Sequence, residues 1–239
     1  MTDRCKPSNV RYFQCDHAAG HAIVAMWNYD LKNSLKTCDD LFDRETKQYP
    51  EAATSCHNGA FMENLFGVHD WGTDKAPKRD WLSKDPYFPC NAFSEKYQKG
   101  CWLNQAARIY QMENGNLEKT AKICQAITNS QYVTWCMDNL SRQIHALTNG
   151  QVAQVFNLCA TEGNYWRENC IVINAGSYYS VGDFNSSLTI CNQLTQAPHD
   201  ACMQLVSSQI VSDNIDQTEK RDRCQQLGGI YGNTCISQI

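Results

Sequence analysis

The 239-residue sequence contains no run of about 18 consecutive apolar residues, the length that a membrane-spanning helix needs. It has no cluster of lysine and arginine either, and its formal net charge is -4. Proteins that bind nucleic acids neutralise phosphates with such clusters. The first residues lack the basic and apolar regions of a signal peptide. We therefore expect no membrane span and no nucleic-acid partner.

Several catalytic motifs are also missing. The Gly-x-Ser-x-Gly elbow, the phosphate-binding Gly-x-x-x-x-Gly-Lys loop and the Cys-x-x-Cys-His haem attachment do not occur. The carboxylates Asp39, Asp40, Asp43 and Glu45 lie close together, a pattern typical of a solvated corner. Alternation of apolar and polar residues, the pattern of strands, is scarce. The scarcity of strand patterns favours an all-α fold. The missing motifs leave open whether the protein is an enzyme.

Cysteine is the residue that the sequence has in excess. The composition is 42% hydrophobic and 19% charged, an ordinary globular balance, yet it includes 14 cysteines. A reducing compartment keeps thiols from pairing, so this density indicates an oxidising one. We predict an extracellular or periplasmic location.

The cysteines fall into two alternating classes that define a repeat. Opening cysteines recur every 32 to 45 residues, which brackets the period of helix–turn–helix repeats, and comprise Cys15, Cys56, Cys101, Cys136, Cys170 and Cys202. Closing cysteines comprise Cys38, Cys90, Cys124, Cys159, Cys191 and Cys224. Five of these six are followed three positions later by a large apolar residue, and Glu162 is the exception. The spacing predicts one domain, residues 1–239, of about six helix pairs.

Between an opening and a closing cysteine, the sequence predicts two helices joined by a turn. Glycine next to asparagine marks the turns at residues 113–116 and 149–150, and glycine next to aspartate marks the turn at 182–183. First helices are expected to begin near Arg11, Ser55, Gly100, Val133, Arg167 and His199. The repeat length and helix-pair layout resemble the tetratricopeptide and Sel1-like class over residues of about 10–235. That resemblance implies an α-solenoid.

Residues 68–84 interrupt the repeat by lengthening the turn of its second unit, and they include Trp71 and Trp81. Long irregular loops in compact domains are often functional. The alternative is a surface loop whose tryptophans cover the end of the solenoid.

The spacing also predicts which cysteines pair. Joining each closing cysteine to the next opening one uses all fourteen, whereas pairing within a repeat leaves Cys5 and Cys235 over. Most of the loops closed in this way span 10 to 12 residues, and closing one contributes about 3 kcal/mol in the chain-entropy model. The predicted bonds are Cys5–Cys15, Cys38–Cys56, Cys90–Cys101, Cys124–Cys136, Cys159–Cys170, Cys191–Cys202 and Cys224–Cys235.

The histidines of the first two repeats form the candidate site. His17 and His21 stand four residues apart, so on a helix their imidazoles share one face. His57 and Glu63 follow the equivalent cysteine of the next repeat, and Asp16 is a further ligand or an acceptor that orients a ring. On helices packed about 8–10 Å apart, these side chains face one another. The set predicts a transition metal ion, Zn, Cu or Fe.

Glycines support this placement, because Gly20 and Gly59 remove side-chain bulk where the two helices are expected to meet. Close helix packing is by itself a sufficient reason for Gly20. His69 is too far along the chain from His57 to share an ion, and His145 and His199 are expected to be structural.

Two functions from different classes follow. The first is a metal-binding protein, which could be a metal-dependent enzyme with an open position for water or substrate. The second is a disulfide-rigidified helical scaffold that binds a protein or small-molecule partner, as repeat proteins commonly do. The sequence does not separate catalysis from transport or storage, and it does not give the oligomeric state.

Overall fold

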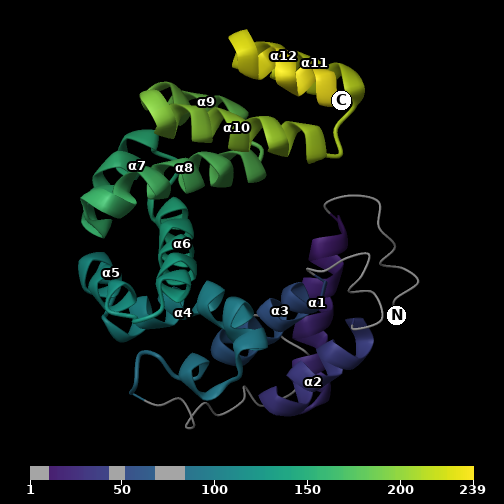
Figure 1. The fold of residues 1–239 in the computed structure, drawn as a ribbon, viewed down its shortest axis with the longest axis vertical. Coiled ribbons are helices and arrows are strands. Elements are labelled where there is room, and N and C mark those ends of the chain that lie inside the picture. The colour runs from purple at the N-terminus through teal and green to yellow at the C-terminus, as the bar shows by residue number, and fades with distance from the viewer. Residues whose placement is uncertain (1–10, 43–51, 68–83) are drawn as a thin grey trace. The chain divides into compact units, whose positions relative to one another are not determined.

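The computed structural model describes residues 11–42, 52–67 and 84–239, and within these ranges the protein is all-α (Figure 1). They contain twelve α-helices, three 3-10 helices and no strand. The predicted all-α class is confirmed. None of these helices is long and apolar enough to cross a bilayer. Residues 68–83 of the predicted inserted loop, with Trp71 and Trp81, lie outside the described residues.

The chain divides into two compact units, which we describe in turn. Unit 1 comprises the described residues up to Gly115 together with Ala126–Asn139, and unit 2 comprises Asn116–Gln125 and Leu140–Ile239. The single domain and the solenoid that the repeat implies stay predictions.

Unit 1 is built around the helix α3. It contains α1 (Arg11–Met26), α2 (Leu31–Phe42), α3 (Ala52–Phe66), η2 (Cys90–Ala92), η3 (Glu95–Tyr97), α4 (Gln98–Met112) and the start of α6 (Ser130–Leu147). Helix α3 packs against α1, α2 and α4. Apolar side chains from the first three helices meet in one core cluster, which consists of Ile23, Cys38, Phe42, Ala52 and Cys56.

Glycines bring α1 and α3 into backbone contact, as the sequence predicts. A Cβ on Gly20 would lie 2.1 Å from the carbonyl oxygen of Cys56, and one on Gly59 would lie 2.0 Å from that of His17. Real Cβ atoms do not approach so closely, so both positions require glycine for packing. This backbone contact holds the part of α1 that follows His17 against α3.

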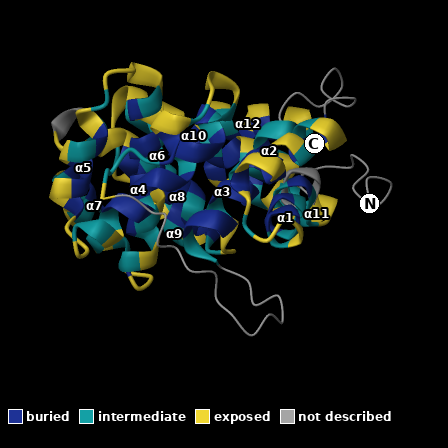
Figure 2. Cartoon of the chain, turned by 90° about the horizontal axis from the view of Figure 1, so that it is seen from below, coloured by how far each residue is buried: buried dark blue, intermediate teal, exposed yellow. Residues whose placement is uncertain are grey.

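Unit 2 is a succession of helices that pack on their neighbours. It contains α5 (Leu117–Gln125), the end of α6, α7 (Val152–Cys159), η4 (Ala160–Glu162), α8 (Asn164–Ser180), α9 (Phe184–Asn192), α10 (Gln196–Ser212), α11 (Gln217–Leu227) and α12 (Gly229–Gln238). Helices that carry opening cysteines, which we call first helices, pack on one another, as α8 does on α10. Helix α10 also contacts α12, which carries Cys235. Helices α9 and α11, which carry closing cysteines, contact the helices before and after them in the chain. Figure 2 shows the buried residues concentrated along first helices such as α8 and α10.

Buried side-chain amides also tie neighbouring first helices together. In unit 1, Asn104 Nδ2 donates to the carbonyl of Asn58 over 3.1 Å. In unit 2, Asn174 Nδ2 donates to the carbonyl of Ser141 over 3.0 Å. Each bond satisfies a polar group that close packing removes from water.

The predicted disulfide scheme is confirmed for five bonds: Cys38–Cys56, Cys90–Cys101, Cys159–Cys170, Cys191–Cys202 and Cys224–Cys235. Cys15, Cys124 and Cys136 are also disulfide-bonded, and no free cysteine occurs in the part of the chain that the structure describes. Cys5 lies outside it, so Cys5–Cys15 stays a prediction, as does the pairing of Cys124 with Cys136.

Helix starts and turns agree closely with the sequence pattern. Helix α1 begins at the predicted Arg11, and the other first helices begin two or three residues before their predicted starts. At α6 the reason is a cap, because Asn129 Oδ1 accepts from the backbone N–H of Gln131. The predicted turns contain glycines with positive φ at Gly115, Gly150 and Gly182.

Candidate functional site

A chain of buried polar groups lies between α1 and α3. His21 Nδ1 donates to Glu63 Oε2 over 2.9 Å, and His21 Nε2 lies 3.0 Å from His17 Nε2. A neutral His21 that donates through Nδ1 has a lone pair on Nε2, which accepts from the Nε2–H of His17. Glu63 is fully buried. These hydrogen bonds thus connect the half-buried imidazole of His17, through His21, to the buried carboxylate of Glu63.

Tyr29, which has a strained backbone conformation, also forms a hydrogen bond to Glu63. Its hydroxyl donates to Glu63 Oε1 over 3.3 Å, and its φ of 66° is in the left-handed region. Asn28 precedes it with φ 51°, as Asn149 precedes Gly150 in the equivalent turn of unit 2. Non-glycine residues seldom adopt this conformation, and strained positions cluster at functional sites. The first repeat therefore places a phenol where the other repeat has glycine.

The structure brings together only part of the predicted metal-ligand set. His17, His21 and Glu63 meet, and Asp16 is buried on the same helix as the two histidines. His57 is separated from them, because it lies on the face of α3 that packs against α4 and bonds to Asp39 instead. Residues 11–42, 52–67 and 84–239 contain no group of three or more His, Cys, Asp or Glu side chains able to hold a metal ion. The five predicted ligands do not fit one ion, and a metal-dependent enzyme is not supported.

His57 instead supports a second polar centre, in which α2, α3 and η3 meet. Its Nε2–H donates to Asp39 Oδ1 over 2.9 Å. Asp39 Oδ2 accepts from the hydroxyl of Tyr97 over 2.6 Å and also from Lys96 Nζ. One carboxylate thus links three elements, and it is not the solvated corner that the acidic cluster predicts. Asp43 and Glu45 of that cluster lie outside the described residues.

The pKa values within this centre are displaced together. Burial raises the pKa of Asp39, but the hydrogen bonds from Lys96 and Tyr97 outweigh it, so this pKa lies below its usual 3.8. The hydrogen bond to Asp39 raises the pKa of Lys96 to about 12. Burial lowers the pKa of His57 by more than the charge of Asp39 raises it. At neutral pH the centre therefore contains a carboxylate, an ammonium group and a neutral imidazole.

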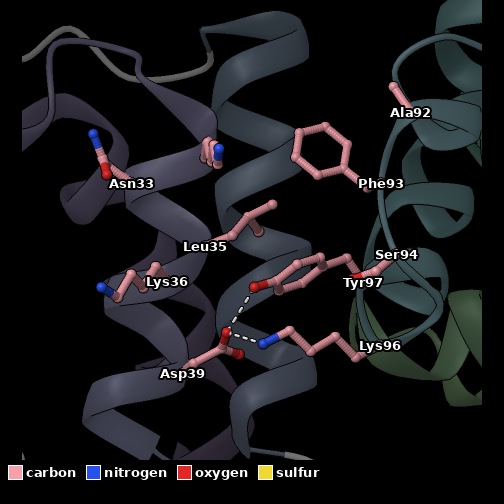
Figure 3. A pocket seen from close by; sticks show the side chains of 10 residues that line it. Asn33, Leu35, Lys36, Asp39, Ala92, Phe93, Ser94, Lys96 and Tyr97 are labelled. Carbon is pink, nitrogen blue, oxygen red and sulfur yellow. Dashed lines mark hydrogen bonds and ion pairs between the residues drawn. The ribbon is translucent and has the colours of Figure 1, made fainter.

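A cavity of about 700 Å³ opens above Asp39, between α2 and the segment that contains η2 and η3. Figure 3 shows Phe93 and Tyr97 projecting from that segment toward Leu35 and Asp39 of α2. Leu35 and the two aromatic rings make part of the wall apolar. Its polar part is mainly cationic, with Lys32, Lys36 and Lys96 against the single carboxylate of Asp39.

The cavity suits binding better than acid–base chemistry. His57 is buried and does not line the cavity. Asp39 and Lys96 form an ion pair with each other. Lys32 and Lys36 are exposed, and neither pairs with a carboxylate among the residues that the structure describes. The wall thus presents two free ammonium groups beside an apolar surface.

Sequence reasoning missed Asp39, Lys96, Tyr97 and Tyr29. Nothing in the sequence connects Asp39 with residues almost sixty positions later. Tyr29 did have a signal, because Asn28–Tyr29 stands where two other repeats have Asn–Gly.

Comparison of the chain with protein-family models, with curated proteins and with solved structures gives no match.

Proposed function

We propose that the protein is a disulfide-stapled helical scaffold of an oxidising extracellular or periplasmic compartment that binds a partner protein at the cavity between α2 and η3. The cavity, about 700 Å³ with a mixed apolar and cationic wall, is the observation that carries this proposal. Ligand sites are typically concave and largely apolar, with a few placed polar groups.

Cross-links on both sides of the cavity support it as a preformed site. Cys38–Cys56 fixes α2 to α3, and Cys90–Cys101 fixes η2 to α4. Asp39 ties α2 to η3 through Lys96 and Tyr97. Walls that are ordered before binding lose little conformational entropy when a partner arrives, so more of the contact energy appears as affinity.

A displayed library of random 12-residue peptides tests this function. Binders selected on the wild-type protein are compared on Ala92→Trp, because Ala92 is an exposed lining residue whose enlargement fills the cavity. Ala160→Trp, an exposed position on η4 in unit 2, is the matched control. Binders that lose affinity for Ala92→Trp and keep it for Ala160→Trp support the proposal. No selected binders, or binders that tolerate Ala92→Trp, contradict it.

A bound transition metal ion is a second proposal, now limited to His17 and His21. The 3.0 Å separation of the two Nε2 atoms favours it, as does Glu63, which orients His21 in the way that carboxylates orient metal-binding histidines. Elemental analysis of the purified protein for Zn, Cu and Fe tests it, with His21→Ala as comparison. A stoichiometric metal that falls in the variant supports the ion, and its absence from the parent protein removes it.

A further inference from the structure

The groups that line the cavity also select the chemistry of the partner. Resting on the proposed function, we infer that the cavity takes an acidic segment of the partner protein, in which carboxylates flank one aromatic or aliphatic side chain.

Charge gives the first half of this inference. Lys32 and Lys36 stand four residues apart on α2, so their side chains share one face of the helix. They have no carboxylate partner among residues 11–42, 52–67 and 84–239, whereas Lys96 is held by Asp39. Two uncompensated ammonium groups in a chain of net charge -4 attract carboxylates and repel cationic segments.

The apolar wall gives the second half. Leu35 forms the floor, and the rings of Phe93 and Tyr97 stand about 6.1 Å apart, perpendicular to one another. Phe61 of α3 supports Phe93 from behind, with ring centroids 5.5 Å apart. A rigid aromatic wall beside a buried leucine accommodates one apolar side chain and removes it from water.

Backbone groups favour a peptide over a small amphiphile such as a fatty acid. Phe93 has φ -109° and ψ 154°, and Ser94 has φ -67° and ψ 162°, so the chain is extended at the rim of the cavity. The backbone N–H of Ser94 donates to no other backbone group in the described part of the chain. An extended segment with a free N–H pairs with the carbonyl of an extended peptide, as edge strands do.

Isothermal titration calorimetry with four probes tests the inference. The first is the peptide Gly-Asp-Glu-Phe-Glu-Asp-Gly, and the second has lysine in place of all four acidic residues. The third has alanine in place of phenylalanine, and the fourth probe is decanoate. Each is titrated into the wild-type protein, into Lys32→Glu/Lys36→Glu, and into Arg142→Glu/Arg221→Glu. The last variant makes the same charge change at two exposed arginines of unit 2.

The acidic phenylalanine peptide should bind the wild-type protein about tenfold or more tightly than the lysine peptide. Its affinity should fall about 2-fold to 30-fold in Lys32→Glu/Lys36→Glu and remain in the arginine control, since exposed ion pairs are individually weak. Replacing phenylalanine by alanine should cost about tenfold or more. Raised salt should weaken the acidic peptide alone.

Each contrary result has a separate meaning. If the acidic and lysine peptides bind alike, or neither binds, the acidic-segment inference is overturned. Library binders that still depend on Ala92 then show that the partner-binding function stands without it. If decanoate binds tighter than every peptide and loses affinity in Lys32→Glu/Lys36→Glu, the ligand is an anionic amphiphile, and the inference is likewise overturned.

Discussion

The two units bury carboxylates in different surroundings. In unit 1, Glu63 contacts an imidazole and a phenol, and Asp39 binds an imidazole, a phenol and an ammonium group. In unit 2, the buried Glu162 accepts from the hydroxyl of Ser141, which lies 3.1 Å from each of its carboxylate oxygens. The disulfides differ as well, with separations of 18 and 11 residues in unit 1 and of 11 residues throughout the three bonds within unit 2.

This difference indicates that the regular repeat serves mainly to pack the helices. Hydrogen-bonded titratable side chains gather in unit 1, where the repeat is less regular. In unit 2, the ring of His145 packs edge to face against Tyr178, with ring centroids 4.7 Å apart. In unit 1, the buried His21 and His57 each donate to a carboxylate, and the turn after α1 has Tyr29 where the turn after α6 has Gly150. The cavity and the strained Tyr29 both belong to the irregular unit.

The largest expected difference is in the loss of stability when a glycine of each unit is replaced by alanine. Gly20→Ala should destabilise the protein by about 3 kcal/mol or more, because the new Cβ would overlap the backbone of Cys56 and Ala60 at 2.1 and 2.7 Å. Gly150→Ala meets nothing within 4 Å, so only its positive φ is penalised, by about 1–2 kcal/mol. Urea unfolding measures both. Equal losses would mean that α1 and α3 are not in backbone contact.

The buried carboxylates should differ next. Glu63→Gln removes a charge-assisted acceptor from His21 and should lower the free energy of unfolding by about 2 kcal/mol. Glu162→Gln keeps an oxygen for the neutral hydroxyl of Ser141 and should lower it by about 1 kcal/mol or less. Urea midpoints at pH 7 compare the two, and a larger loss at Glu162 would reverse the contrast.

Acid should destabilise unit 1 through His57. Its pKa is lower in the fold than its usual 6.5, so the unfolded chain binds more protons and stability falls as the pH drops below 6.5. Asp39 adds a further loss only below its usual 3.8, because its pKa is also lowered by folding. His57→Gln should flatten the slope just below pH 6.5. A slope just below pH 6.5 that is equal in His57→Gln and in the parent protein would contradict this prediction.

The smallest effect concerns the turns. Tyr29→Gly relieves a left-handed residue and loses the 3.3 Å hydrogen bond from the phenol to Glu63, so its free energy of unfolding should stay within about 1 kcal/mol of the parent. Gly150→Tyr introduces the same strain without a partner and should cost about 1–2 kcal/mol. Thermal unfolding of the pair checks this. A severe loss in Tyr29→Gly would indicate that the phenol contributes more than its hydrogen bond to Glu63.

Cysteine spacing, turn glycines and small residues predict most of the fold, because these features act within a few residues or at a fixed helical offset. They locate the helix pairs, five confirmed disulfides and the contact of Gly20 with α3. Glu162, the one exception among residues that follow closing cysteines, is buried all the same, and it accepts from the hydroxyl of Ser141 on α6.

The site was predictable only in part. Glu63 was expected beside His21 from its position after the second opening cysteine, and it is there. His57 follows the same cysteine by one residue and lies on another face of α3, so that the helical period separates it from His21. The partners of Asp39 come from a 3-10 segment after an irregular stretch, which no spacing rule places.

Hydrogen–deuterium exchange of the wild-type protein with saturating acidic phenylalanine peptide tests the central claim most directly. The peptide should protect backbone amides of residues 31–42 in α2 and of residues 90–97, including Ser94, and it should leave unit 2 unchanged. Protection confined to unit 2, or none in the two segments that form the cavity, would contradict the assignment of this cavity as the binding site.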